Sequence, residues 1–578
     1  MNYPSGLLLS LVTLVTPAFA REFDLILRGG TVIDGTGTER RIADVAITGD
    51  TIAAVGNLSS STAPLEINVS GWVVAPGFID MHAHLDRDEG LLSTDPRRRA
   101  AQNFVAQGIT TGAVNQDGRQ PPSLVEERQA MQVAGIGVNV ALLNGHNALR
   151  AMVLKDDQER AATEAEIEAM KAILRRGMEE EGSFGLSLGL EYYSGRYSTT
   201  AELVELAKVL PEYGGLYIAH QRSQGIAPMW YKPSENPGVP PPTLEVSLGE
   251  TIRVAETTGV NTVVTHMKGW GPGYRGQAAK WIALLQAARD RGARLFIDLY
   301  AFDSAGSDGD FVMLPPWSLG GRTSSRPDET IDFTAQLRLT LDSPASTMHD
   351  LVQDVEHQVA LKGGAENVVI LDYPDPNYIG KTIAEIMALR QATLTEVAIA
   401  LQLEGESTKA GGAKMRALSL DERDVALYFA QPWAAVGTDG WVVLPEEAVG
   451  PLKYIGTNRR CFGTFPRRLG YFSQELQVDS LEEAVRKATS LPADIINIPD
   501  RGRLVPGKKA DIVVLDMAHL RDQTSVAEPN VYPTGVQHVF VNGIAAVRNG
   551  QRTLALAGRV LDPPGRPALA RPQLASNP

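Results

Sequence analysis

Apolar runs typical of buried β-strands alternate with helical stretches through most of this chain. Eight runs read as strands: Gly71–Ile79, Ile109–Val114, Gly137–Leu143, Gly185–Leu190, Gly215–Ala219, Val260–Thr265, Ala293–Leu299 and Ala434–Gly437. Helical stretches separate most of them: Leu124–Val133, Glu164–Glu180, Thr200–Tyr213, Val246–Thr258 and Ala278–Arg291. This alternation predicts an α/β protein whose core is a (β/α)8 barrel of the TIM type.

The barrel is expected to span residues 73–495. A long stretch at about residues 302–429 separates its seventh and eighth strands, so it must hold extra helices or a lid. Asp350–Leu361 and Thr382–Leu403 look helical within this insertion.

Short β runs punctuated by Gly and Asp lie outside the barrel, at residues 21–72 and 496–562. Asn542-Gly543 and Asn549-Gly550 predict hairpin turns in the second of these segments. The two chain ends are therefore expected to build one small β-sandwich beside the barrel. Residues 563–578, rich in Pro and Ala, predict an unstructured tail.

The first 20 residues are typical of an export signal. Leu7 to Val15 is mostly apolar, and Ala18-Phe19-Ala20 supplies small residues at a cleavage position before Arg21. The alternative is a buried N-terminal segment. The apolar run is too short to span a bilayer comfortably, and no Cys follows it, so no stable membrane anchor is expected. We predict an exported protein, periplasmic or secreted, whose single Cys461 cannot form an intrachain disulfide.

Composition narrows the class of partner. Of 578 residues, 43% are hydrophobic and 21% charged, which fits a soluble enzyme. The net charge of −14 argues against general binding of nucleic acid or anionic membranes. We expect a small-molecule substrate and make no prediction of oligomeric state.

Polar residues follow the strand runs, at the barrel end where such folds place their chemistry. His82 and His84 follow the first run, and alternation along a strand points both side chains the same way. Later runs end at further candidates: Asp117, Glu191, His220, His266 and Asp439. Imidazoles that converge in this way can hold a divalent metal such as zinc.

The order His-x-His, His, His, Asp on strands one, five, six and eight resembles the amidohydrolase superfamily. Further phrases narrow the resemblance to the N-acyl-D-amino-acid deacylases, and they span nearly the whole mature chain in the expected order. These phrases are Gly108-Ile-Thr-Thr111, Gly185-Leu-Ser-Leu-Gly-Leu190, Gly214-Gly-Leu-Tyr-Ile-Ala-His220, Thr265-His-Met-Lys268, Gly437-Thr-Asp-Gly440, Gly463-Thr-Phe-Pro-Arg467 and Arg501-Gly-Arg-Leu-Val-Pro-Gly507.

The resemblance implies a metal-dependent hydrolase that cleaves the amide bond of N-acyl-D-amino acids with metal-activated water. It implies one or two divalent ions, zinc in the first place, held by His82, His84, His220 and His266. Asp439 matches the carboxylate that binds metal and shuttles protons between the water and the leaving amine.

Two features depart from the resembling enzymes. Strand four ends without the lysine that bridges two metals in many amidohydrolases. The deacylases also carry a metal-ligating Cys in an Asn-Cys-Gly phrase after strand two, where this chain has Asp117. Asp117 can ligate or bridge, although carboxylate is harder than thiolate. The alternatives are that Asp117 is a turn residue and that Glu191 is the bridge.

Cationic residues near the expected site favour an acidic substrate. Lys268, two residues after His266, matches a lysine that binds the substrate α-carboxylate in the deacylases. Arg460 matches an arginine with the same role, although neighbouring Arg459 competes for it. Tyr300 matches an aromatic residue that helps to hold the substrate.

Two other functions remain open. The nearest rival enzyme is another amidohydrolase, such as a dipeptidase or a cyclic-amide hydrolase. A rival of another class is a non-catalytic periplasmic binding protein. The set of four His with Asp439 argues against the latter, because binding alone needs no proton shuttle.

Overall fold

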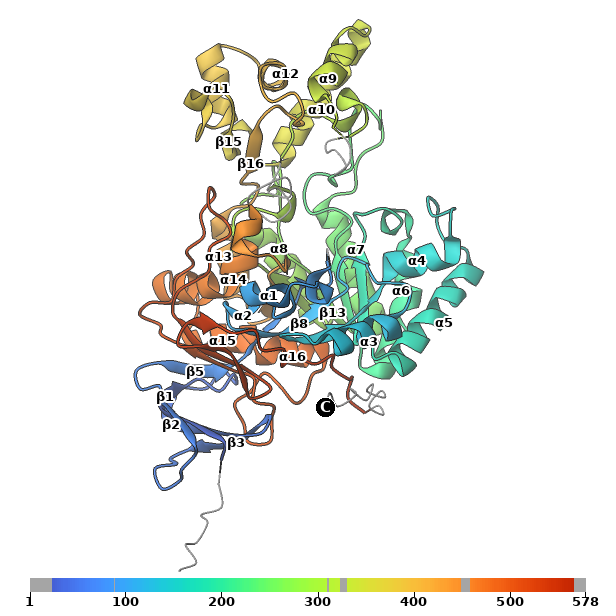
Figure 1. The fold of residues 1–578 in the computed structure, drawn as a ribbon. Coiled ribbons are helices and arrows are strands. Elements are labelled where there is room, and N and C mark those ends of the chain that lie inside the picture. The colour runs from blue at the N-terminus through green and yellow to red at the C-terminus, as the bar shows by residue number, and fades with distance from the viewer. Residues whose placement is uncertain (1–22, 88, 309–310, 323–329, 449–457, 566–578) are drawn as a thin grey trace, which may run out of the picture.

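Eight parallel strands pair into a ring, and helices lie around the strands (Figure 1). The computed structural model describes residues 23–87, 89–308, 311–322, 330–448 and 458–565. The strands follow the ring in chain order: β6 (Phe78–Asp80), β8 (Ile109–Val114), β9 (Asn139–Leu142), β11 (Gly185–Gly189), β12 (Leu216–His220), β13 (Asn261–Val264), β14 (Leu295–Leu299) and β17 (Ala434–Val436).

Short strands extend the ring and close it. β10 (Asn144–Gly145) continues β9 and pairs with β11. β7 (Ala83–His84) continues β6 and pairs in parallel with β18 (Gly440–Trp441), which continues β17. The N–H of Met81 donates to the carbonyl oxygen of Val436 at 3.1 Å, so the first and last strands are neighbours. The predicted (β/α)8 barrel is confirmed.

The barrel helices form where the sequence supplies both a capping residue and apolar residues at helical spacing. Thr163 caps α5 (Glu164–Glu180) in a reciprocal arrangement with Glu166, which satisfies two backbone donors. One face of α5 is buried against β11, through Met170, Leu174 and Met178. The remaining barrel helices are α3 (Leu124–Ala134), α4 (His146–Leu154), α6 (Thr200–Ala207), α7 (Leu244–Thr258), α8 (Ala278–Asp290), α13 (Glu422–Ala430), α15 (Leu481–Ala488) and α16 (Ser490–Ile496).

Both chain ends join in a second sheet of nine strands. Its order is β22-β21-β20-β19-β5-β1-β2-β3, with β4 paired to β1. The N-terminal strands are β1 (Leu25–Val32), β2 (Arg41–Thr48), β3 (Thr51–Gly56), β4 (Leu65–Asn68) and β5 (Val73–Pro76). The C-terminal strands are β19 (Ile512–Leu515), β20 (Val536–Val541), β21 (Ile544–Arg548) and β22 (Gln551–Arg552). The chain ends therefore build one β unit, as predicted.

This sheet curls back on itself around its own apolar core. Ile52, on the edge strand β3, exchanges backbone hydrogen bonds with Gly507 and Lys508, which lead into β19 near the middle of the sheet. The hairpin turns at Asn542-Gly543 and Asn549-Gly550 have positive φ at both residues, as turns that match strand twist require.

The run Gly71–Ile79, predicted as one strand, divides at Gly77. β5 pairs antiparallel with β19, whereas β6 pairs with β8 in the barrel. A Cβ on Gly77 would lie 2.3 Å from Thr110 Oγ1, so only glycine lets the chain pass between the two units here. The barrel begins at Phe78, five residues later than the predicted boundary at 73.

The insertion between β14 and α13 forms a helical unit with its own apolar core, above the barrel in Figure 1. It contains α9 (Phe333–Leu341), α10 (Ala345–Leu361), α11 (Ile383–Arg390) and α12 (Leu394–Glu404). An antiparallel pair that the sequence pattern did not predict, β15 (Val368–Asp372) and β16 (Lys414–Ala417), completes it. A buried ion pair, Lys362 to Asp308 at 2.8 Å, ties the end of α10 to the barrel loops.

The predicted signal segment, residues 1–20, lies outside the described residues, as does the predicted tail beyond residue 565. Among the residues that are described, we find no helix that is both long and apolar enough to cross a membrane.

Candidate active site

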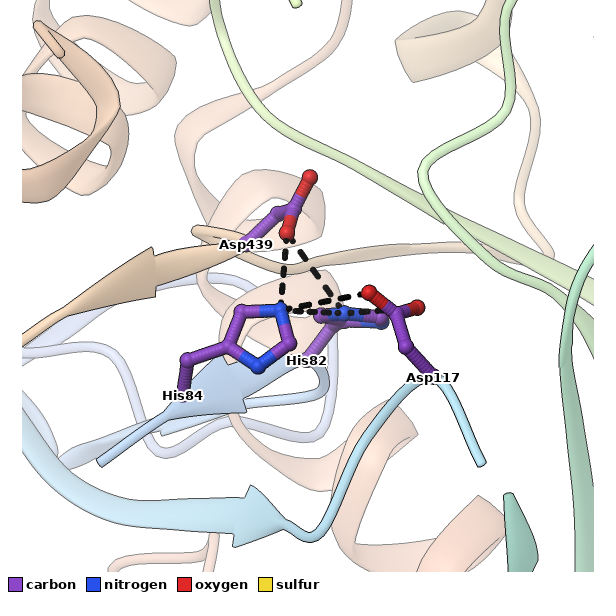
Figure 2. A group of neighbouring side chains, drawn as sticks. All are labelled: His82, His84, Asp117 and Asp439. Carbon is purple, nitrogen blue, oxygen red and sulfur yellow. Dashed lines mark hydrogen bonds and ion pairs between the residues drawn. The ribbon is translucent and has the colours of Figure 1, made fainter. Parts of the chain in front are cut away.

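The strand ends bring the predicted metal ligands together in two groups that share one carboxylate. His82, His84, Asp117 and Asp439 form the first group, and Figure 2 shows their side chains pointing toward one another. Asp117 forms the second group with His220 and His266. In each group the potential ligand atoms lie within 4.8 Å of one another, and all six residues are buried.

Asp117 is the centre of this arrangement. Its Oδ1 lies 3.4 Å from His220 Nδ1 and 3.7 Å from the Nε2 atoms of His82 and His266. Its Oδ2 lies 3.5 Å from His84 Nε2. The side chain thus faces imidazoles from both groups. A residue that only formed a turn would not need contacts with four imidazoles.

The donor set fits divalent cations. Buried polar atoms normally have hydrogen-bond partners, yet Asp117 Oδ1 and His220 Nδ1 have none among the described residues. Imidazole nitrogen and carboxylate oxygen together suit zinc and similar ions. Divalent cations between these groups would satisfy the unpartnered atoms and offset the burial of two carboxylates.

The backbone is strained where it presents these ligands. Asp117, His266 and Asp439 have φ of 58°, 36° and 49°, a left-handed region that non-glycine residues rarely adopt. Such strain persists only where the surrounding structure holds it, and it gathers at functional sites. Each strand therefore ends in a sharp bend that turns its ligand inward.

Glu191, the alternative bridge, lies outside both groups. Its Oε2 is 2.7 Å from Nε2 of His220, and its Oε1 accepts from the N–H of Met229. It therefore orients the ring of His220, whose other nitrogen faces Asp117.

His82 is held from behind by a relay. Its Nδ1 lies 2.5 Å from Thr265 Oγ1, which donates to Asp298 Oδ2 at 2.7 Å. Asp298 also accepts from the N–H of His266 at 2.8 Å, and burial raises the pKa of Asp298 to about 7. Asp80, two residues before His82, accepts from Thr438. The sequence analysis missed these supporting residues. Asp80 stands two residues before His82 and Asp298 two residues before Tyr300, and because side chains alternate along a strand, this spacing could have identified both.

The candidate substrate residues gather beside Asp439. Arg460 Nη1 lies 2.7 Å from Asp439 Oδ2, and the guanidinium lies 5.2 Å from the centre of the Tyr300 ring. Lys268 Nζ lies 5.5 Å from the same ring. Arg460 Nε and the Tyr300 hydroxyl have no hydrogen-bond partner among the described residues. Both groups can therefore donate a hydrogen bond to a substrate.

Arg459 faces away from the site. Its guanidinium lies over Phe302 and approaches Asp303 and Asp522, at 3.8 and 3.6 Å. Of the two arginines, Arg460 is thus the one that meets the ligand groups.

Charge in this buried space shifts several pKa values. Burial acts to raise the pKa of Asp439, but Arg460 and His84 outweigh it and hold that pKa far below its usual range. His220, His266 and His84 likewise outweigh burial at Asp117 and lower its pKa. Both carboxylates are therefore ionised at neutral pH. Burial lowers the pKa of Lys268 to about 8.

Comparison with known proteins gives one consistent picture. Residues 420–545 match the amidohydrolase family. The chain is 31% identical to the D-aminoacylase of Alcaligenes xylosoxydans xylosoxydans over 94% of this chain and 98% of that protein. A crystal structure of D-aminoacylase superimposes with a TM-score of 0.68 at 29% identity, covering 93% of this chain and 100% of the other.

A fourth likeness concerns a structure with bound ligands. N-acyl-D-glutamate deacylase from Bordetella bronchiseptica, complexed with zinc and a phosphonate mimic of the tetrahedral intermediate, matches with a TM-score of 0.65 at 26% identity. It covers 93% of this chain and 99% of that one. With near-complete coverage at 31% identity and a shared fold, the chain belongs to the D-aminoacylase family of metal-dependent amidohydrolases.

Proposed function

We propose that this enzyme hydrolyses the amide bond of N-acyl-D-amino acids and releases a carboxylic acid and a free D-amino acid. The observation that carries the proposal is the buried pair of cations, Arg460 and Lys268, beside the ligand groups. Arg460 is 4% exposed and has an unpartnered N–H, which is costly unless an anion uses it. An α-carboxylate has the geometry that a guanidinium binds best.

The metal-binding part of the proposal assigns one or two zinc ions to the two groups. His82, His84 and Asp439 would hold one ion, His220 and His266 the other, and Asp117 would bridge them. When bound, zinc lowers the pKa of water to about 7 and polarises the scissile carbonyl. Asp117 suits this role because each of its two carboxylate oxygens faces one or more imidazoles.

The residues of this chain handle the proton and the substrate charge. The Asp439 carboxylate accepts the proton of the attacking water and then delivers it to the nitrogen of the leaving amine. Arg460, Lys268 and Tyr300 hold the substrate carboxylate, which fixes the amide carbon over the ligand groups. A substrate carboxylate also shares the Arg460 charge and so loosens its hold on Asp439.

We also propose that the protein acts outside the cytoplasm, after removal of residues 1–20. Support comes from the apolar run Leu7–Val15 and the small residues before Arg21. Intact mass of the protein recovered from the periplasm or medium tests this, because a chain that still begins at Met1 would overturn it.

The decisive experiment is a screen of matched N-acyl-D- and N-acyl-L-amino acids with zinc added, read as released free amino acid. Acyl length varies from acetyl to long chains, and a dipeptide and a cyclic amide are included for the rival amidohydrolase activities. We expect turnover of acyl amino acids with a preference for the D series. Turnover only of the dipeptide or cyclic amide would refute the proposal, and binding without turnover in any series would indicate a binding protein.

A further inference from the structure

Two hydrogen-bond donors converge on one ring nitrogen of His266. Gln224 Nε2 lies 2.8 Å from His266 Nδ1, and Lys268 Nζ lies 2.9 Å from the same atom. The other ring nitrogen, Nε2, faces Asp117 at 3.7 Å. A metal bound at Nε2 requires the ring proton on Nδ1, and that N–H then needs an acceptor.

Gln224 can supply this acceptor, whereas Lys268 cannot, because an ammonium group only donates. Gln224 is 2% exposed, and its Oε1 has no hydrogen-bond partner among the described residues. A half-turn of the amide exchanges its oxygen and nitrogen, which places Oε1 against Nδ1. The same turn gives the buried oxygen a partner and moves the amide nitrogen to the position that the oxygen leaves.

We propose that Gln224 accepts the Nδ1 proton of His266 and thereby holds this ring in the form that binds metal through Nε2. Gln224 is then a positioning residue of the metal centre, in the way that Glu191 positions His220. The inference rests on the metal centre of the proposed function.

The same change leaves Lys268 with more donor capacity for the substrate. Once Nδ1 carries a proton, Lys268 loses that acceptor, and Nζ keeps its bond to the carbonyl oxygen of His266 at 2.8 Å, which leaves its other N–H groups for a carboxylate. Its Nζ lies 5.5 Å from the Tyr300 ring and 5.9 Å from the Trp270 ring, so aromatic faces already border the ammonium group. Metal binding and readiness for the substrate carboxylate are therefore linked through one imidazole.

The backbone keeps Gln224 at this spacing. The carbonyl oxygen of Gln224 accepts from the N–H of Trp270 at 3.0 Å, which ties it to the loop that follows His266. A Cβ on Gly225 would lie 1.9 Å from Trp270 Cδ1, so glycine lets the two loops meet here.

The test compares zinc affinity among three variants, by competition with a chromophoric chelator. Gln224→Met removes the acceptor and Gln224→Glu keeps it. Gln221→Met is the matched control, because Gln221 is equally buried but bonds to the Ala219 carbonyl oxygen and to Thr251. We expect Gln224→Met to raise the zinc Kd by roughly 10- to 100-fold. Gln224→Glu and Gln221→Met should stay near wild type.

Equal zinc affinity in Gln224→Met and wild type overturns the inference, and so does a loss in Gln224→Glu as large as that in Gln224→Met. If Gln224→Met does not fold, as judged by melting of the zinc-free protein, Gln224→Asn withdraws the acceptor by one methylene and is expected to weaken zinc binding as well. The assay needs no substrate. A wild type that binds zinc but cleaves no acyl amino acid therefore refutes the proposed function and leaves the role of Gln224 standing.

Discussion

Replacement of Asp117 is the sharpest test of the metal centre, because this carboxylate alone belongs to both groups. A four-ligand zinc site binds with ~10–16 kcal/mol, so one ligand carries roughly 3 kcal/mol, about a 100-fold change in Kd. Asp117→Ala removes a ligand from both groups at once. We expect it to lose most of its metal at micromolar protein, measured as metal per chain by elemental analysis after gel filtration.

Two further variants at this position separate charge from backbone strain. Asp117 has φ of 58°, which Asn tolerates better than Ala, so Asp117→Asn keeps the backbone while it weakens the ligand. Asp117→Cys should recover zinc and bind it in preference to harder ions such as Mn²⁺, because thiolate is the softer ligand. Glu191→Gln, which touches His220 from behind, should lose less metal than Asp117→Ala. Full metal occupancy in Asp117→Ala would refute the bridging role, and a larger loss in Glu191→Gln would transfer that role to Glu191.

Three other predictions follow from the site and its surroundings. Asp439→Asn should keep its fold and metal-free melting temperature but lose turnover by roughly 10²-fold or more, and retention of above about a tenth of activity contradicts the proton shuttle. Arg460→Lys keeps the positive charge but loses the paired N–H donors of the guanidinium, so kcat/KM should fall about 30-fold or more. An unchanged kcat/KM would show that Arg460 does not bind the substrate carboxylate. Burial raises the pKa of Glu127 to about 8, above its unfolded value of about 4.3, so its contribution to stability falls as pH rises between these values. Glu127→Gln should therefore melt higher than wild type by roughly 3 °C at pH 8 and by little at pH 5, and equal differences at both pH values would exclude this titration.

The sequence pattern predicted the barrel and most of the site because both depend on local rules. Strand runs with a period of two and capped helices repeat around the ring, and each ligand stands one to five residues beyond a run, with His220 and His266 directly after theirs. The candidate substrate residues that the motifs indicated, Lys268 and Arg460, lie near Asp439, and their role in binding a substrate stays a prediction.

The features that pattern reasoning missed depend on contacts between distant segments. The break at Gly77 arises because Thr110 leaves no room for a side chain, which no periodicity reveals. Glu191 turns behind His220 because the loop with Met229 fixes its other oxygen. Gln224 reaches His266 only because Trp270 holds the two loops together. Such partners have no signature in local sequence.

The shared terminal sheet has a consequence for the order in which this enzyme matures. β5 pairs with β19, Ile512 opposite Pro76, so the strand that leads into the barrel has no partner on that side until the chain has been made as far as β19. During synthesis, β5 presents an open hydrogen-bonding edge, and contacts this distant in sequence form slowly. A polypeptide cut before β19 would keep that edge exposed, and would be prone to pair with other chains. The sheet that β1 to β5 begin is thus completed only after the barrel between them and β19 has been made.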